Sequence, residues 1–239
     1  MHRWRLRVSQ PAPARRLRRK VGVSKTRVVL VRHGESIVTV RRVLGGPRTC
    51  VGLSDLGKLQ AAKLRDRLAS TKEIDADVLI SSAYPRALQT ADIVKDAFGF
   101  SDVVVDPNFG EHDPGPECDG LTFDEFVRRH GRPDWGGDPH AVVFPGGETI
   151  AQFHDRVHGA LDATVRAHFG KTIVIACHGG VIDAILRRAV HAPATGKFEF
   201  HTRNCSLTEM VEQRDRHWAV IRYNDHAHLH DLPEATPSE

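Results

Sequence analysis

The chain has 239 residues, of which 40% are hydrophobic and 27% charged, and its formal net charge is +4. Ten of its 34 Lys and Arg residues lie within residues 1–27 and no acidic residue precedes Glu35, so the remaining chain is mildly acidic. An acidic body argues against nucleic-acid binding. No run of about 18 apolar residues occurs, which excludes a membrane-spanning helix at the level of sequence.

Two features bear on the environment of the protein. Residues 1–25 are rich in Arg and contain Pro11 and Pro13, and we expect them to form a basic, disordered tail. An arm for an anionic partner and an organelle-targeting peptide are the alternatives. The four cysteines are far apart and form no C-x-x-C pair, which is typical of reduced thiols in a cytoplasmic protein and gives no support to a zinc site.

Apolar runs and helical patterns alternate along the chain. Short runs predict strands at residues 28–31, 77–81, 103–105, 172–176, 207–211 and 218–222. Apolar residues three or four apart predict helices after Ser54, from Pro85 to Phe98, and over residues 121–130, 150–165 and 180–190. This alternation predicts a three-layer α/β/α fold with a mainly parallel central sheet, in one domain over residues 26–232, with a polar tail at 233–239.

Side chains suited to phosphate chemistry follow the predicted strands: Arg32 and His33, then Arg86, then Glu111, then His178. Ligands of parallel sheets bind beyond the carboxyl ends of the strands, so we expect these residues to converge there. Residues 106–147, rich in Gly, Pro, Asp and His, are expected to cover the site.

Each of these residue types has a role in phosphoryl transfer. Guanidinium groups match phosphate oxygens bidentately, which suits Arg32 and Arg86. Two nearby cations disfavour a protonated imidazole, so His33 is expected to be neutral at pH 7 and able to attack phosphorus. His178 would stabilise the transferring group electrostatically, and Glu111 would protonate the leaving group.

Except for Glu111, these residues lie in longer stretches that run in the order 31–36, 53–57, 81–91, 145–149, 177–182, 204–206 and 224–229, and Glu111 stands between the third and the fourth. In these stretches the sequence resembles the histidine phosphatase superfamily, which contains cofactor-dependent phosphoglycerate mutases and many small-molecule phosphatases. The resemblance implies a phosphohistidine intermediate on His33. It also implies a phosphate pocket formed by Arg32, Arg86 and His178, Glu111 as proton donor, and no metal. We expect no cofactor.

Three further residues are assigned to phosphate or substrate binding. They are Ser36, Thr39, which lies three residues beyond the first stretch, and Gly179, the last through a backbone N–H at the start of a helix. Thr39 stands where the family often has Asn, and Cys177 where it usually has Ser or Thr. We expect a modest loss of rate from these two departures. Arg41, Arg42 and Arg48 are expected near the entrance.

The favoured hypothesis is a phosphatase acting on a small phosphorylated substrate. A phosphoglycerate-type mutase is the first alternative, but the residues after Glu111 lack the Tyr-Gly and Arg-containing pieces of mutase-type members. A catalytically weak phosphate-binding member is the second, motivated by Thr39 and Cys177. A zinc site on the histidines of residues 225–230 is disfavoured, because this segment matches the family in any case.

Overall fold

A six-stranded sheet forms the centre of the computed structural model, which describes residues 25–214 and 217–236. Its strands are β1 (Arg27–Arg32), β2 (Val78–Ser81), β3 (Val104–Val105), β4 (Thr172–Cys177), β5 (Leu207–Arg214) and β6 (His217–Asp225). The order across the sheet is β3-β2-β4-β1-β5-β6, in which the first four strands pair in parallel and β5 pairs antiparallel with both β1 and β6. The predicted mainly parallel sheet is confirmed. The basic tail predicted at residues 1–25 lies, except for Lys25, outside the described residues.

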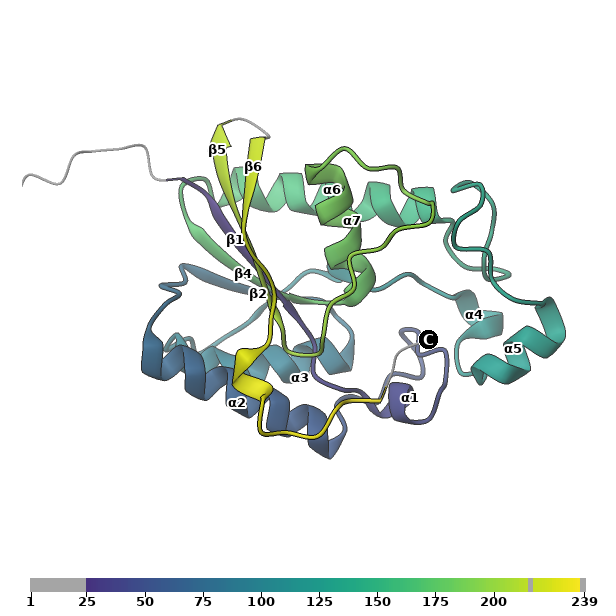
Figure 1. The fold of residues 1–239 in the computed structure, drawn as a ribbon, viewed down its shortest axis with the longest axis horizontal. Coiled ribbons are helices and arrows are strands. Elements are labelled where there is room, and N and C mark those ends of the chain that lie inside the picture. Colours follow the sequence, from purple (N-terminus) through teal and green to yellow (C-terminus); the bar gives the residue numbers. More distant parts are fainter. Residues whose placement is uncertain (1–24, 215–216, 237–239) are drawn as a thin grey trace, which may run out of the picture.

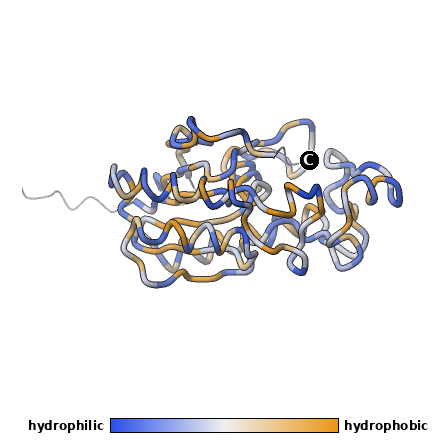
Figure 2. The backbone as a smooth tube through the Cα atoms, turned by 90° about the horizontal axis from the view of Figure 1, so that it is seen from below, coloured by the Kyte–Doolittle hydropathy of each residue, from blue (hydrophilic) through white to orange (hydrophobic). Residues whose placement is uncertain are grey.

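Two helical layers cover the sheet, as Figure 1 shows. Helices α2 (Asp55–Thr71) and α3 (Pro85–Val94) pack on one face, and α6 (Ile150–Ala167) and α7 (Gly179–Ala189) pack on the other. Strand β1 serves both layers: Val29 and Val31 belong to the α2–α3 core, whereas Val28 and Leu30 belong to the α6–α7 core. Figure 2 shows the apolar stretches running through the interior. The predicted α/β/α layering is therefore confirmed.

The helices begin where local chemistry predicts. The Ser54 hydroxyl accepts the backbone N–H of Gly57 at 3.0 Å and caps α2, and Thr149 forms a capping box with Gln152 at the start of α6. Pro85 occupies the first turn of α3. Within residues 25–214 and 217–236, no helix is long and apolar enough to cross a membrane.

One local prediction was wrong. The sequence predicts a helix from Pro85 to Phe98, whereas α3 ends at Val94 and continues only as the 3-10 turn η1 (Lys95–Ala97), with Gly99 (φ 74°) turning the chain directly after Phe98. Strand β3 is the edge strand of the sheet, and its two valines are 54% and 50% exposed.

The covering segment, residues 106–147, is built from short helices. These are η2 (Pro107–Phe109), α4 (Gly115–Cys118) and α5 (Phe123–His130). A small core of Cys118, Phe126 and Phe144 joins α4 and α5. The four-residue helix α1 (Ile37–Val40) lies at the same end of the molecule (Figure 1). Helices α1 and α4 had no clear sequence pattern. The 3-10 turn η3 (Ala227–Leu229) leads to the last described residues, where the Thr236 N–H donates to Glu35 Oε2 at 2.7 Å.

Candidate active site

Three buried side chains meet beyond the carboxyl ends of β1 and β4. Arg32 at the end of β1 is in register with Cys177 at the end of β4, so His33 and His178 follow neighbouring strands. Their ring centroids are 5.0 Å apart. Arg86, in the first turn of α3, donates from Nε to His33 Nε2 at 3.2 Å and to His178 Nδ1 at 3.3 Å. We call His33, Arg86 and His178 the strand-end rim.

The hydrogen bonds of the strand-end rim determine which imidazole nitrogens carry protons. A guanidinium can only donate, so His33 Nε2 and His178 Nδ1 are the acceptors. The opposite nitrogens have acceptors of their own: His33 Nδ1 lies 2.7 Å from the carbonyl of Gly34, and His178 Nε2 lies 2.8 Å from Ser82 Oγ. Both rings are therefore neutral and direct a lone pair toward Arg86.

Burial and charge favour the same protonation state. Burial lowers the pKa of His33 well below its usual value, and the cations Arg86 and Arg32 lower it further. Burial is also the largest cause of the lowered pKa of His178, followed by Arg86. The neutral His33 expected from the neighbouring arginines is thus favoured first by desolvation, which the sequence could not reveal.

Arg32 and Glu111 lie together at the start of α7. The Arg32 guanidinium packs against Gly179, where a Cβ atom would be 3.5 Å from Arg32 Cζ. Glu111 Oε2 accepts the backbone N–H of Gly180 at 3.1 Å. A Cβ atom at Gly180 would lie only 2.3 Å from Glu111 Oε1, so a glycine is needed there for the carboxylate to approach the helix.

Ser36 and Thr39 contact each other at the start of helix α1. Ser36 is the N-cap of α1, and its hydroxyl lies 2.8 Å from the hydroxyl of Thr39. Contact of either residue with phosphate stays a prediction. The neighbouring Glu35 is buried and accepts the Ser54 hydroxyl at 2.7 Å, so it fastens the loop after β1 to the start of α2.

Ser82 and Tyr84 support His178, although the sequence gave them no role. Besides the contact of Ser82 with His178, the Tyr84 ring centroid is 5.0 Å from that of His178, and Arg86 Cζ lies 4.6 Å from the Tyr84 centroid. Both residues lie in the predicted 81–91 stretch, so the signal for them was present without an assignment.

Arg156 on α6 supports Glu111 and had no sequence signal. Its guanidinium donates to the carbonyls of Gly110 and Glu111 at 3.1 and 3.3 Å and forms a two-point ion pair with Glu148, with both distances 2.7 Å. The Glu148 carboxylate also accepts the N–H of Asp113 at 3.1 Å. This pair therefore fixes the backbone on both sides of Glu111.

Residues of the disfavoured zinc site, in the segment 225–230, have other partners in the structure. Asp225 Oδ2 pairs with Arg67 Nη2 at 2.7 Å, and His228 Nδ1 lies 3.4 Å from Arg67. Among the residues that the structure describes, no three His, Cys, Asp or Glu side chains are placed to bind a metal ion together. The four cysteines are buried free thiols.

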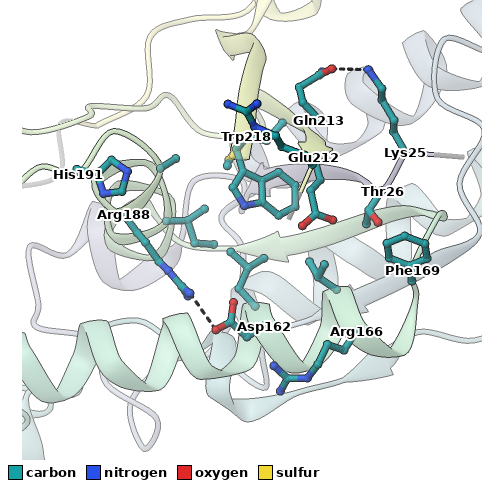
Figure 3. A pocket seen from close by; sticks show the side chains of 16 residues that line it. Lys25, Thr26, Asp162, Arg166, Phe169, Arg188, His191, Glu212, Gln213 and Trp218 are labelled. Atoms are coloured by element: carbon teal, nitrogen blue, oxygen red, sulfur yellow. Dashed lines mark hydrogen bonds and ion pairs between the residues drawn. The ribbon is translucent and has the colours of Figure 1, made fainter. Parts of the chain in front are cut away.

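A cavity of about 700 Å³, shown in Figure 3, is lined by none of the three residues of the strand-end rim. It is lined by residues of α6, α7, β5 and β6 and by Lys25 and Thr26, which precede β1, whereas His33 follows β1. The ion pair between Arg188 and Asp162 (2.9 Å) crosses one side of it. The cavity contains none of the predicted site residues, so we do not assign the reaction to it.

Comparison with known proteins shows which family this three-layer α/β chain resembles in sequence. The sequence profile of the histidine phosphatase superfamily (branch 1) matches residues 28–226. Phosphoglycerate mutase-like protein 4 of Arabidopsis thaliana is 30% identical over 212 residues, which cover 87% of this chain and 89% of that protein. The metal-independent phosphoserine phosphatase of Arabidopsis thaliana is 29% identical over 215 residues, which cover 88% and 86%.

A solved structure shares the fold. The mycobacterial glucosyl-3-phosphoglycerate phosphatase in complex with VO3 has a TM-score of 0.67 and 23% identity, covering 83% of this chain and 98% of that one. The chain belongs to the histidine phosphatase superfamily, as its motifs predicted.

Proposed function

We propose that this protein is a phosphatase that hydrolyses a small phosphorylated metabolite through a phosphohistidine intermediate on His33. The observation that carries the proposal is the contact of one guanidinium, Arg86, with the lone pairs of two buried neutral imidazoles, His33 and His178. A phosphate group placed there meets a nucleophile, a second imidazole and a cation at once.

In the first step, the Nε2 lone pair of His33 attacks phosphorus and the ester P–O bond breaks. Glu111 gives its proton to the departing alkoxide. In the second step, water attacks the phosphohistidine, Glu111 takes a proton from that water, and the P–N bond breaks to release inorganic phosphate. Arg32 and Arg86 hold the phosphate oxygens. His178 is protonated once the phosphate dianion is bound, and as an imidazolium it offsets the charge that develops on these oxygens.

The names of two similar proteins support a small phosphomonoester as substrate. One relative is called a phosphoserine phosphatase and one structural neighbour a glucosyl-3-phosphoglycerate phosphatase. A screen over phosphoamino acids, phosphoglycerate derivatives and sugar phosphates would therefore begin with these two classes. We further propose that the protein acts in the cytoplasm and needs no metal.

The decisive test is the substitution His33→Ala, assayed with p-nitrophenyl phosphate. We expect hydrolysis to be abolished, because Ala has no nucleophile, while a chelator leaves the wild-type rate unchanged. His217→Ala, which removes an exposed histidine on β6, is the matched control and should keep the full rate. Undiminished hydrolysis by His33→Ala would refute the proposal.

Phosphoglycerate mutase activity is the second candidate, because the 30% identical relative is named mutase-like. It would use the same residues with a bisphosphate primer. Measuring phosphate release and isomerisation in the same reaction with 3-phosphoglycerate separates the two activities. Dominant isomerisation would replace hydrolysis as the assigned reaction.

A further inference from the structure

Asp119 is a buried carboxylate in the covering segment. It is the C-cap of α4, and its side chain is 1% exposed. Its Oδ1 accepts the N–H of Gly46 at 2.9 Å and the hydroxyl of Thr49, while its Oδ2 accepts the N–H of Arg48 at 2.8 Å. The Arg48 Nε lies 3.6 Å from Oδ2. One carboxylate thus holds the loop at residues 46–49, which follows α1.

Backbone hydrogen bonds also join the residue before Gly45 to the covering segment. The N–H of Leu44 donates to the carbonyl of Leu121 at 2.8 Å, and the N–H of Gly120 donates to the carbonyl of Leu44 at 2.9 Å. Leu44 and Gly46, the two neighbours of Gly45, are therefore both fastened to the covering segment. The Gly45 carbonyl between them has little freedom to turn.

The Gly45 carbonyl in turn holds the rim arginine. Arg86 Nη1 donates to it at 3.0 Å, while Arg86 Nε faces His33 and His178. A guanidinium is a rigid planar fork, so fixing one of its edges fixes the direction of the others. A continuous series of contacts runs from Asp119 through residues 45–49 to Arg86.

We propose that Asp119 is a positioning residue, which holds Arg86 against His33 and His178 through the Gly45 carbonyl. This inference rests on the proposed function. The covering segment then helps to orient Arg86. If residues 46–49 become loose, one edge of the Arg86 guanidinium loses its fixed acceptor. Asp119 itself touches neither imidazole, so its effect passes through Arg86.

The first test compares two substitutions at Asp119 with one nearby. We expect Asp119→Ala to lower kcat/KM for p-nitrophenyl phosphate about 10- to 100-fold, the range expected when a catalytic group is displaced by a remote change. Asp119→Asn keeps one acceptor oxygen and should lose less. Asp124→Asn, which makes the same charge change at an exposed position of α5, is the control and should match the wild type.

A double-mutant cycle separates positioning from general damage to the fold. In an Arg86→Ala background, Asp119→Ala should add less than about a twofold further loss, because its effect passes through the missing side chain. Losses that simply multiply would overturn the proposal. Thr49→Val removes a single donor without changing side-chain shape, so it serves if Asp119→Ala does not fold, and it should give a smaller loss of the same kind.

A spectroscopic readout tests the same point without activity. The Arg86 Nε–H signal in a 1H–15N spectrum, assigned by its absence in Arg86→Lys, reports the hydrogen bond to the imidazoles. We expect it to move in Asp119→Ala and to stay in Asp124→Asn. An unmoved signal overturns the positioning role. A wild type that hydrolyses no phosphomonoester instead refutes the proposed function and leaves this readout intact.

Discussion

The strand-end rim and the covering segment contribute to the same candidate site but are held by different means. His33 and His178 follow two neighbouring buried strands, and the parallel register of β1 and β4 sets their separation. The covering segment consists of short helices and loops. Side-chain carboxylates fasten it: Glu148 holds the backbone near Glu111, and Asp119 holds the loop near Arg86.

From this difference we expect two kinds of substitution: those that remove a reacting side chain and those that move a reacting side chain out of position. The strands that precede His33 and His178 are held by backbone hydrogen bonds, so a substitution of either histidine deletes a reacting group and leaves its neighbours in place. The covering segment depends on a few side-chain atoms, so a substitution there moves a group that remains chemically intact. The predictions below ask whether the two regions respond in these two ways.

The largest effect is expected from Arg156→Met. This change removes the donors to the carbonyls of Gly110 and Glu111, so the Glu111 carboxylate should leave its position and kcat/KM should fall about 100-fold. Arg188→Met breaks an ion pair of similar exposure at the cavity and should leave the rate unchanged. Equal losses in the two variants would show that Arg156 contributes only to stability.

A smaller effect is expected from Ser82→Ala, which removes the partner of His178 Nε2. The change leaves the Nε2–H of His178 buried without its acceptor, and an unsatisfied buried donor costs about 1–3 kcal/mol. We expect kcat/KM to fall about tenfold, because 1.4 kcal/mol corresponds to that factor. Ser81→Ala is the matched control: this hydroxyl is equally buried but donates to the Ser82 carbonyl. If both variants lose the same activity, His178 does not depend on Ser82.

The smallest effect is a loss of stability in acid. Burial lowers the pKa of His33 and His178, whereas unfolding restores a value of about 6.5. The unfolded state then binds more protons below pH 6.5, so the unfolding free energy falls as the pH falls. We expect about 1 kcal/mol per histidine between pH 7 and 5.5. His154 and His228, whose pKa burial lowers to about 4, should add to this slope.

Urea unfolding at the two pH values measures this slope. In His33→Gln the side chain at position 33 cannot be protonated, so the change in unfolding free energy between the two pH values should be smaller by the contribution of one histidine. His217→Gln, at an exposed position, should leave it unchanged. A slope that is the same in all three proteins would contradict the assigned burial effect on His33.

Much of the rim could be predicted because its signals are local. The apolar run before Arg32 predicts a buried strand, and the turn after such a strand predicts where His33 and His178 lie. Asp119 and Arg156 could not be assigned in this way, whereas Ser82 lies in the predicted 81–91 stretch but received no role. Asp119 meets residues about 70 positions away, and nothing in the spacing of the sequence indicates that partner.

The sequence by itself determined the family, the alternation of strands and helices, and the residue types that follow each strand. Periodicity and motif depend on neighbours within a few positions, and such patterns are visible in a linear chain. Only the tertiary structure decided which histidine nitrogens face Arg86, how strongly burial keeps the two imidazole rings neutral, and which carboxylates hold the covering segment. Desolvation and long-range hydrogen bonds arise only when distant segments pack together, so no local pattern records them.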